Sequence, residues 1–288
     1  RRMRALRTEI TKQFNSNLSL QFNQHSQYDH FTPIIQDESF LVLRDRKQLN
    51  LEQGLRLRYS TQMAHRKVLQ RGLLIDVNTA FRQNVSTGKS SFINTLHAQY
   101  GKKLQRDILW NSQVSLGNST GGANTIFVLG GNRNQYRPTV TDSRINIENA
   151  SFVQPVYGVR NFNLNTRSGN TFGFVNTELW VPMYSYFGKR PIKNALLQNL
   201  WVIGFADIGT AWYGKSPKEK TNVSNITTLE DGRLTITIFN ARNPIVYSGG
   251  FGLRTSIFGY FVRYDLAWTY DNNVLKSNVS RVSLGRSF

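Results

Sequence analysis

The feature that most constrains this sequence is an alternation of apolar and polar residues in segments of about ten residues. Successive side chains of a β-strand point to opposite faces of the sheet, so each segment has one apolar and one polar face. In GYFVRYDLAWTY (259–270), Arg263 and Asp265 lie on the polar face. The opposite face carries apolar and aromatic residues, namely Tyr260, Val262, Tyr264, Leu266, Trp268 and Tyr270. Such a strand suits a sheet that separates lipid from water.

The same alternation recurs in LSLQFN (18–23), LEQGLRLRYS (51–60) and LLIDVNTAFR (73–82). No stretch approaches the roughly 20 apolar residues of a membrane helix, whereas a membrane-spanning strand needs only about 9–11 residues. The sequence therefore predicts an all-β fold, a transmembrane antiparallel β-barrel.

We predict about twelve strands, because the alternating segments have the length of barrel strands. They lie near residues 4–14, 17–27, 38–46, 51–61, 73–84, 91–103, 107–118, 171–183, 198–213, 245–257, 260–271 and 279–288. No linker rich in proline, glycine or serine divides the chain, so residues 1–288 are predicted to form one domain. The N-terminal RRMRALRTEI lacks the apolar core of a signal peptide, so we expect the sequence to begin within a longer precursor.

Loop lengths predict the topology. Barrels have short periplasmic turns and long extracellular loops, and the last strand ends on the periplasmic side. Counting back from Phe288, the two longest connections, 119–170 and 214–244, both fall outside. The turn Glu230-Asp231-Gly232 predicts a small hairpin within the second of them.

The net charge of +19 suggests a nucleic acid or an anionic membrane as partner. The basic residues are scattered along alternating segments rather than clustered on one helix face, which disfavours a nucleic acid. We expect them to face a water-filled lumen or anionic lipid head groups. The absence of cysteine excludes disulfides and zinc–thiolate sites.

Two motifs with possible chemistry are weak. The segment 87–90 (TGKS) lacks the upstream glycine of a phosphate loop and is predicted to be a turn. His25 and His30 flank Asp29, but no second histidine cluster completes a metal or hydrolase site. We therefore predict no catalytic residue, no metal and no cofactor, and a protein that is not an enzyme.

Within about residues 105–288, four features follow one another in the order expected of one family: a loop motif, a strand motif, a last hairpin and a terminal aromatic residue. Val159-Arg160-Asn161-Phe162 resembles a Val-Arg-Gly-Phe loop motif, and the segment from Phe205 through Asp207 to Gly209 resembles a Phe-x-Asp-x-Gly strand motif. A further segment resembles a last hairpin with its terminal aromatic residue, and contains Gly252, Arg254, Arg263, Asp265 and Phe288. Together they resemble the Omp85 superfamily of BamA-like and TamA-like outer-membrane barrels.

The resemblance implies that loop 119–170 folds back into the lumen and that Arg160 pairs with Asp207, and with Glu178, on the inner wall. The alternation independently points both carboxylates inward. Asn161 replaces the motif's glycine, and asparagine tolerates positive φ better than most residues. The family barrel has about sixteen strands, so this chain corresponds to its C-terminal part or to a smaller relative.

The implied function is assembly, insertion or translocation of polypeptides through a seam at strand 279–288. Ser283 and Gly285 belong to this candidate gate strand, and glycine weakens a strand. The implied partners are outer-membrane lipid and lipopolysaccharide, client outer-membrane or secreted polypeptides, and accessory periplasmic or lipoprotein subunits. The implied location is a Gram-negative outer membrane with a periplasmic C-terminus. The asparagine-rich stretch 163–176 resembles Omp85 relatives from Bacteroidetes-type bacteria.

Two other functions stay open on the sequence alone. The first is a passive or gated pore whose basic lumen favours anions. The second is a barrel hydrolase, or a barrel that anchors a periplasmic domain outside this chain.

Overall fold

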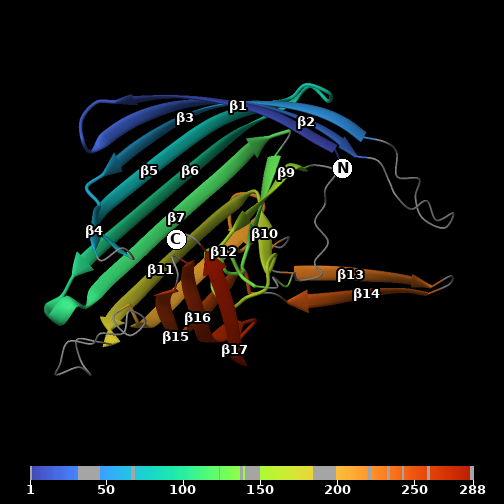
Figure 1. Cartoon of the computed structure of the whole chain (residues 1–288). Helices are drawn as coiled ribbons and strands as arrows, with labels where there is room; N and C mark the ends of the chain where they lie inside the picture. The colour runs from blue at the N-terminus through green and yellow to red at the C-terminus, as the bar shows by residue number, and fades with distance from the viewer. Residues whose placement is uncertain are drawn as a thin grey trace.

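The structure is a computed structural model, and it describes residues 2–31, 46–65, 69–122, 124–136, 139, 150–183, 199–219, 222, 224–231, 234–241, 243–257 and 260–285. Strands dominate these residues (Figure 1). They are β1 (Arg2–Gln13), β2 (Leu18–Phe31), β3 (Arg46–Ser60), β4 (Met63–His65), β5 (Leu69–Asn84), β6 (Lys89–Lys103), β7 (Leu109–Gly121), β8 (Asn124–Leu129), β9 (Ala150–Val156), β10 (Arg167–Gly169), β11 (Thr171–Pro182), β12 (Trp201–Trp212), β13 (Ser224–Asp231), β14 (Leu234–Ala241), β15 (Ile245–Ile257), β16 (Tyr260–Asp271) and β17 (Val274–Gly285). None of the described helical segments has the length and apolar character to cross a membrane.

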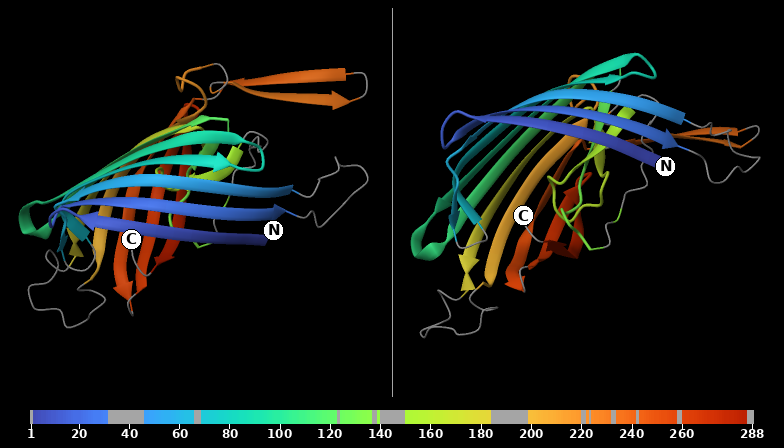
Figure 2. Two further views of the ribbon diagram at one scale, coloured as in Figure 1. Left: turned by 90° about the horizontal axis from the view of Figure 1, so that it is seen from above. Right: turned by 45° about the horizontal axis from the view of Figure 1, so that its top comes forward.

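One large antiparallel sheet forms the body of the molecule. Its strand order is β1-β2-β3-β5-β6-β7-β11-β12-β15-β16-β17, and the short β4 pairs with β5. The sheet curves strongly, so that β1 and β17 lie at the two ends of a trough (Figure 2). Within the described strands, β1 pairs only with β2 and β17 only with β16. The predicted fold class, an all-β antiparallel sheet of the barrel type, is confirmed.

Eleven of the predicted strands coincide with strands of this sheet to within a few residues at each end. The remaining one, 38–46, lies outside the described residues except for Arg46, which begins β3. Among the described residues, β2 pairs directly with β3 from Leu18 opposite Tyr59 to Phe31 opposite Arg46. Residues 184–198, which connect β11 to β12, also lie outside the described residues.

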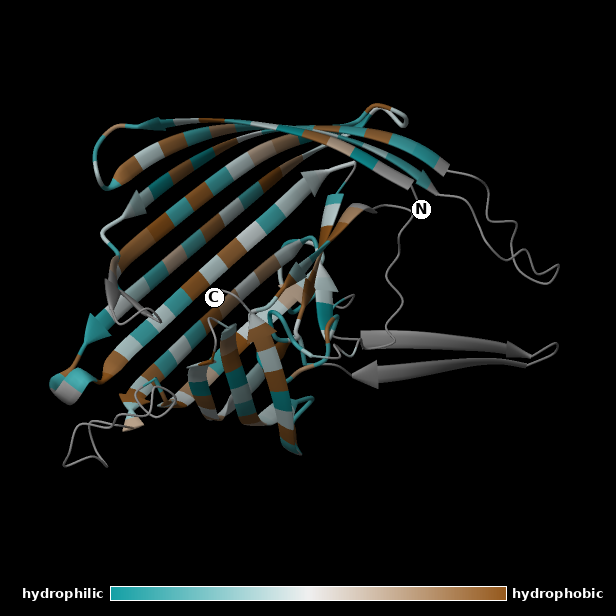
Figure 3. Cartoon of the chain, viewed as in Figure 1, coloured by the Kyte–Doolittle hydropathy of each residue, from teal (hydrophilic) through white to brown (hydrophobic). Residues whose placement is uncertain are grey.

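The alternation of the sequence appears as two different faces of the sheet. In β16, Phe261, Asp265 and Ala267 are buried, whereas Tyr264 and Trp268 are 40% and 39% exposed. Figure 3 shows the same alternation as bands of opposite hydropathy along the strands. The outer face therefore presents large apolar side chains, which include Leu55, Leu57, Phe92, Leu116, Val175, Leu179, Phe251, Leu253, Val282 and Leu284.

A smaller sheet lies on the concave side of the trough (Figure 1). β8 pairs in parallel with β9 and antiparallel with β10. We call the described residues of 124–169 the plug segment. Phe127, Leu129 and Val159 of this segment are fully buried in a cluster that includes Phe172 and Phe174 of β11. Burying each such side chain contributes about 1.5–3 kcal/mol, so the plug segment is packed onto the wall and not merely threaded past it.

The predicted hairpin within 214–244 is present. β13 pairs with β14 from Ser224 opposite Ala241 to Asp231 opposite Leu234, and the pair projects away from the large sheet (Figure 1). Gly232 of the predicted turn lies outside the described residues.

Candidate functional site

Arg160 ties the plug segment to the wall of the large sheet. Its Nε donates to Asp207 Oδ2 at 2.7 Å, its backbone N donates to the same oxygen at 3.1 Å, and its Nη2 pairs with Asp207 Oδ1. The side chains of Arg160 and Asp207 are 7% and 0% exposed. Residues of β12 alternate between buried and more exposed positions, and Asp207 occupies one of the buried positions, which face the concave side. The predicted contact between the two residues is present.

Glu178 and Phe205 complete the surroundings of the guanidinium group. Arg160 Nη1 pairs with Glu178 Oε1, and Glu178 Oε2 accepts a hydrogen bond from Trp180 Nε1 at 2.7 Å. The Arg160 guanidinium carbon lies 4.0 Å from the centre of the Phe205 ring, a cation–π contact. Burial alone would lower the pKa of Arg160, but the charges of Asp207 and Glu178 outweigh it and raise the pKa above its ordinary value. This arginine is therefore a permanent cation between two carboxylates.

The neighbours of Arg160 in the loop motif fit the wall closely. Asn161 has φ 63°, so it adopts the left-handed conformation that glycine favours. Val159 is fully buried against Gly209, where an added Cβ would lie 2.5 Å from Val159 Cγ2. Phe162 is 5% exposed in the same apolar cluster. Gly209 thus provides the space in which the loop motif docks.

The last hairpin, β15 with β16, holds a second buried charge group. Asp265 is fully buried and pairs with Arg254 Nη1 at 2.7 Å and with Arg263 Nε at 2.5 Å. Arg254 is only 1% exposed and also donates to the carbonyl oxygen of Tyr264 at 3.2 Å. An added Cβ at Gly252 would lie 2.5 Å from Asp265 Oδ1, so glycine is required beside this group. The four predicted hairpin residues therefore form one cluster.

The edge of β17 is covered by the plug segment. Gln135 forms an antiparallel bridge with Ser283. Tyr136 N donates to the Val282 carbonyl oxygen at 2.9 Å, and Leu284 N donates to the Asn134 carbonyl oxygen at 3.1 Å. Ser283 is 3% exposed. Two backbone groups on this edge of β17, the Val282 carbonyl oxygen and the Leu284 N–H, are thus bonded to Tyr136 and Asn134 of the plug segment.

Side chains of β17 and the plug segment strengthen this contact. Arg281 Nη2 donates to the Asn161 carbonyl oxygen at 3.1 Å and to Asn163 Oδ1 at 2.8 Å. In return, Asn161 Nδ2 donates to the Val279 carbonyl oxygen. The loop motif that holds Arg160 therefore also contacts the predicted gate strand.

The remaining predicted residues are placed as follows. Gly285 ends β17 and lies opposite Phe261, and Phe288 lies outside the described residues. The turn between β5 and β6 comprises residues 85–88, so the turn predicted at 87–90 lies two residues earlier, and Lys89 and Ser90 begin β6. Within the described residues no three side chains of His, Asp or Glu are grouped to hold a metal ion, and His25, Asp29 and His30 lie along β2.

Two further arginine anchors were not predicted. Arg167 Nη2 of β10 pairs with Asp271 Oδ1 at 2.6 Å, and burial lowers the pKa of Arg167 even though Asp271 acts in the opposite direction. Arg82 Nη1 of β5 donates to Thr125 Oγ1 at 2.7 Å, and its guanidinium carbon lies 4.0 Å from the Phe152 ring centre. The alternation had placed Arg82 on the polar face, but a single strand pattern does not identify a partner in a distant loop.

Comparison with known proteins shows the fold. No family model matches the sequence, and no curated protein matches it. Among solved structures, CdiB from Acinetobacter baumannii is 13% identical with a TM-score of 0.51 over 98% of this chain and 41% of that chain. The crystal structure of BamA from Haemophilus ducreyi lacking POTRA domains 1–3 is 10% identical with a TM-score of 0.54 over 98% of this chain and 54% of that chain.

The large sheet and its plug segment define a barrel-type protein. The two structural neighbours show that its fold is similar to those of CdiB and BamA. This chain spans about half the length of these neighbours, or less.

Proposed function

We propose that this chain is the barrel part of a Gram-negative outer-membrane protein that inserts or translocates polypeptides, with the edge of β17 as the template for the incoming chain. The observation that carries the proposal is the bridge between Gln135 and Ser283. An unpaired strand edge is a ready template for another strand, and proteins usually cover such edges. Here the cover is a short loop segment, which can be exchanged for a longer strand.

Membrane insertion is supported by the outer face of the sheet. Large apolar side chains from β3 to β17 lie exposed on that face, for example Leu57 at 45% and Leu284 at 49%. Apolar patches of this extent on a soluble monomer are rare, and in a barrel they contact lipid. The polar residues and ion pairs, by contrast, lie on the concave side.

The contacts of the plug segment support a mechanism without bond chemistry. Arg160 anchors the loop motif to Asp207, while Asn161 and the segment 134–136 contact β17. Movement of the plug segment would therefore free the β17 edge. The proposed partners are outer-membrane lipid and lipopolysaccharide, client outer-membrane or secreted polypeptides, and accessory periplasmic or lipoprotein subunits, with the C-terminus in the periplasm of a Bacteroidetes-type cell.

A disulfide lock tests the proposal. Gln135 and Ser283 face each other, and the hydrogen bonds beside them join Tyr136 to Val282 and Asn134 to Leu284. Residues in such a non-hydrogen-bonded pair have Cα atoms about 4.5 Å apart, which suits a disulfide. The chain has no cysteine of its own, so Gln135→Cys with Ser283→Cys gives it two thiols that can form one bridge. We expect oxidised cells to lose client outer-membrane proteins and a reductant to restore them.

The matched control is a lock between strands that remain paired. Tyr264 of β16 lies opposite Val282 of β17, so Tyr264→Cys with Val282→Cys joins two neighbours of the same sheet. This lock should leave client levels unchanged. If the Gln135–Ser283 lock forms and clients still assemble normally, the β17 edge does not open and the proposal fails.

One observation favours a gated pore as the second candidate. A cavity of about 700 Å³ lies between the plug segment and the end of the sheet, and its described lining carries Arg167, Lys276 and Arg281 against one acidic residue, Asp271. Basic side chains around a pore favour anions. Steady anion-selective conductance across a planar bilayer, unaffected by the Gln135–Ser283 lock, would support this alternative.

A further inference from the structure

A small cleft between the plug segment and the wall has an unusual excess of positive charge. It encloses about 110 Å³. Arg133 and Arg160 of the plug segment and Arg263 of β16 line it, and Glu178 of β11 is the single acidic residue among the described residues of the lining. Asn111 and Asn176 add amide groups.

The single carboxylate is already occupied. Glu178 Oε1 pairs with Arg160 and Oε2 accepts from Trp180 Nε1. Arg160 Nε and Nη2 both bind Asp207. Neither oxygen of Glu178 is therefore free to balance the other two arginines.

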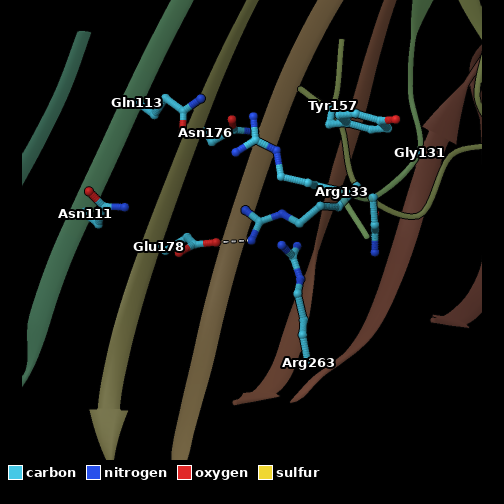
Figure 4. Close-up of a pocket in the computed structure, with 10 residues that line it drawn as sticks. Asn111, Gln113, Gly131, Arg133, Tyr157, Asn176, Glu178 and Arg263 are labelled. Atoms are coloured by element: carbon cyan, nitrogen blue, oxygen red, sulfur yellow. Dashed lines mark hydrogen bonds and ion pairs between the residues drawn. The ribbon is translucent and has the colours of Figure 1, made fainter. Parts of the chain in front are cut away.

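The other two arginines have unused donors. Arg263 uses Nε to bind Asp265, but its Nη2 is buried and has no hydrogen-bond partner among the described residues. Arg133 forms no hydrogen bond or ion pair with the described part of the chain. Figure 4 shows Arg133 extending from the plug segment toward Asn176 and Gln113, and Arg263 extending from the wall toward the Glu178 end of the cleft. A buried unpaired guanidinium nitrogen is costly, and a bound anion would remove that cost.

We propose that this cleft binds a phosphate-type oxyanion, held between Arg133 and Arg263 beside the Arg160–Glu178 pair. Guanidinium groups bind phosphate through paired N–H donors, and an oxyanion with several oxygens can accept from donors that approach from different sides. Asn111 of β7 supplies a further amide, and Asn176 of β11, whose Nδ2 already donates to the Gly158 carbonyl oxygen, keeps one N–H for an anion. The same chemistry fits free phosphate and the phosphate of a lipid head group.

The position of the site gives it a structural consequence. Arg133 precedes Asn134 and Gln135, which cover the β17 edge, and Arg263 belongs to the fixed wall. An anion that bridges them would hold the covering segment in place. The proposal concerns anion binding itself and stands whether or not the β17 edge acts on client chains.

Equilibrium dialysis of radiolabelled inorganic phosphate against the full-length protein in neutral detergent tests the site. We expect saturable binding of one phosphate per chain. Arg133→Gln should weaken it about tenfold, because a charge-assisted hydrogen bond to an anion is lost. The phosphate affinity of Arg133→Lys should lie between those of the unsubstituted protein and Arg133→Gln, because lysine keeps the charge but lacks the planar fork of donors. Arg133 lies on the exposed side of the plug segment, so these changes do not threaten folding.

The matched control is Arg58→Gln. Arg58 is an exposed arginine on the same strand face as Arg56 and does not line the cleft, so the net charge changes equally while binding should not. Competition with short-chain phosphatidic acid in mixed micelles identifies the source of the phosphate group: displacement at equal stoichiometry assigns a lipid phosphate, and no displacement assigns free phosphate. Non-saturable binding, or equal losses in Arg133→Gln and Arg58→Gln, would reduce the effect to general attraction by a basic protein and overturn the proposal.

Discussion

Strands at the two ends of the sheet share the same alternation, but only one end has a covered inner face. In β1 the described side chains are exposed on both faces, with Leu6 at 70% and Ile10 at 64%. In β12 the inward residues are buried, and Asp207 and Ala211 are each 4% exposed. The difference comes from the plug segment, which packs mainly on β11, β12 and their neighbours. Alternation thus orients side chains, whereas burial depends on what lies opposite them.

The ion pairs of the two regions differ in solvent exposure, as their apolar side chains do. Asp76 of β5 pairs with Arg56, which is 40% exposed, whereas Asp207 of β12 pairs with the buried Arg160. Ion pairs open to solvent contribute little to stability, but removing one partner of a buried pair leaves an uncompensated charge. The two aspartates therefore offer a direct comparison between the regions.

The largest expected effect is the loss of Asp207. Asp207→Ala leaves Arg160 with Glu178 as its remaining carboxylate and should lower the free energy of unfolding by about 3–5 kcal/mol. Asp76→Ala should lower it by about 1 kcal/mol or less, because Arg56 is exposed enough to be hydrated. Urea unfolding of the refolded protein in lipid vesicles measures both. Equal losses of unfolding free energy in the two variants would mean that burial by the plug segment does not strengthen the Arg160–Asp207 pair.

The next prediction concerns the outer face, which both regions share. Leu55→Arg in β3 and Leu179→Arg in β11 each place a cation on this face, where the leucines are 53% and 43% exposed. In a bilayer each change should cost about 2–4 kcal/mol near the midplane. Asn78→Arg on the inner face of β5 is the control and should change stability little. If both outward arginines cost less than about 0.5 kcal/mol, that face contacts water and the membrane assignment is wrong.

Much of this architecture follows from local pattern. The period of two fixed which residues share a face, so it placed Glu178 and Asp207 inward before any partner was known. Their pairing with Arg160 came from the family resemblance, because 18 and 47 residues separate the partners and no local rule joins them. The left-handed conformation of Asn161 also fits the glycine of that motif.

The unpredicted parts depend on contacts between distant segments. The bridge from Gln135 to Ser283 uses backbone groups, which every residue carries, so no side-chain pattern marks it. The parallel pairing of β8 with β9 likewise leaves no period of its own in such short strands. The buried Asp265 pairs with two arginines, Arg254 and Arg263, whereas a sequence pattern suggests at most one partner for each charge.

The smallest expected effect tests the space in which the plug segment docks. Gly209 and Gly204 both lie in β12, but an added Cβ at Gly209 would lie 2.5 Å from Val159 Cγ2 and 3.2 Å from Leu129 Cδ2, whereas one at Gly204 would meet nothing within 4 Å. Gly209→Ala should therefore cost about 1–3 kcal/mol through overpacking and make the plug segment easier to cleave by protease. Gly204→Ala should do neither.

A second substitution identifies the cause of that loss. Val159→Ala shortens the side chain that an alanine at 209 would strike, so Gly209→Ala combined with Val159→Ala should be protected from protease better than Gly209→Ala alone. Such non-additivity is the mark of two residues in direct contact. If the effects of the two substitutions are additive, Gly209→Ala acts on the strand itself, because glycine and alanine also differ in backbone freedom. In that case the fit between the loop motif and β12 does not hold the plug segment on this half of the sheet.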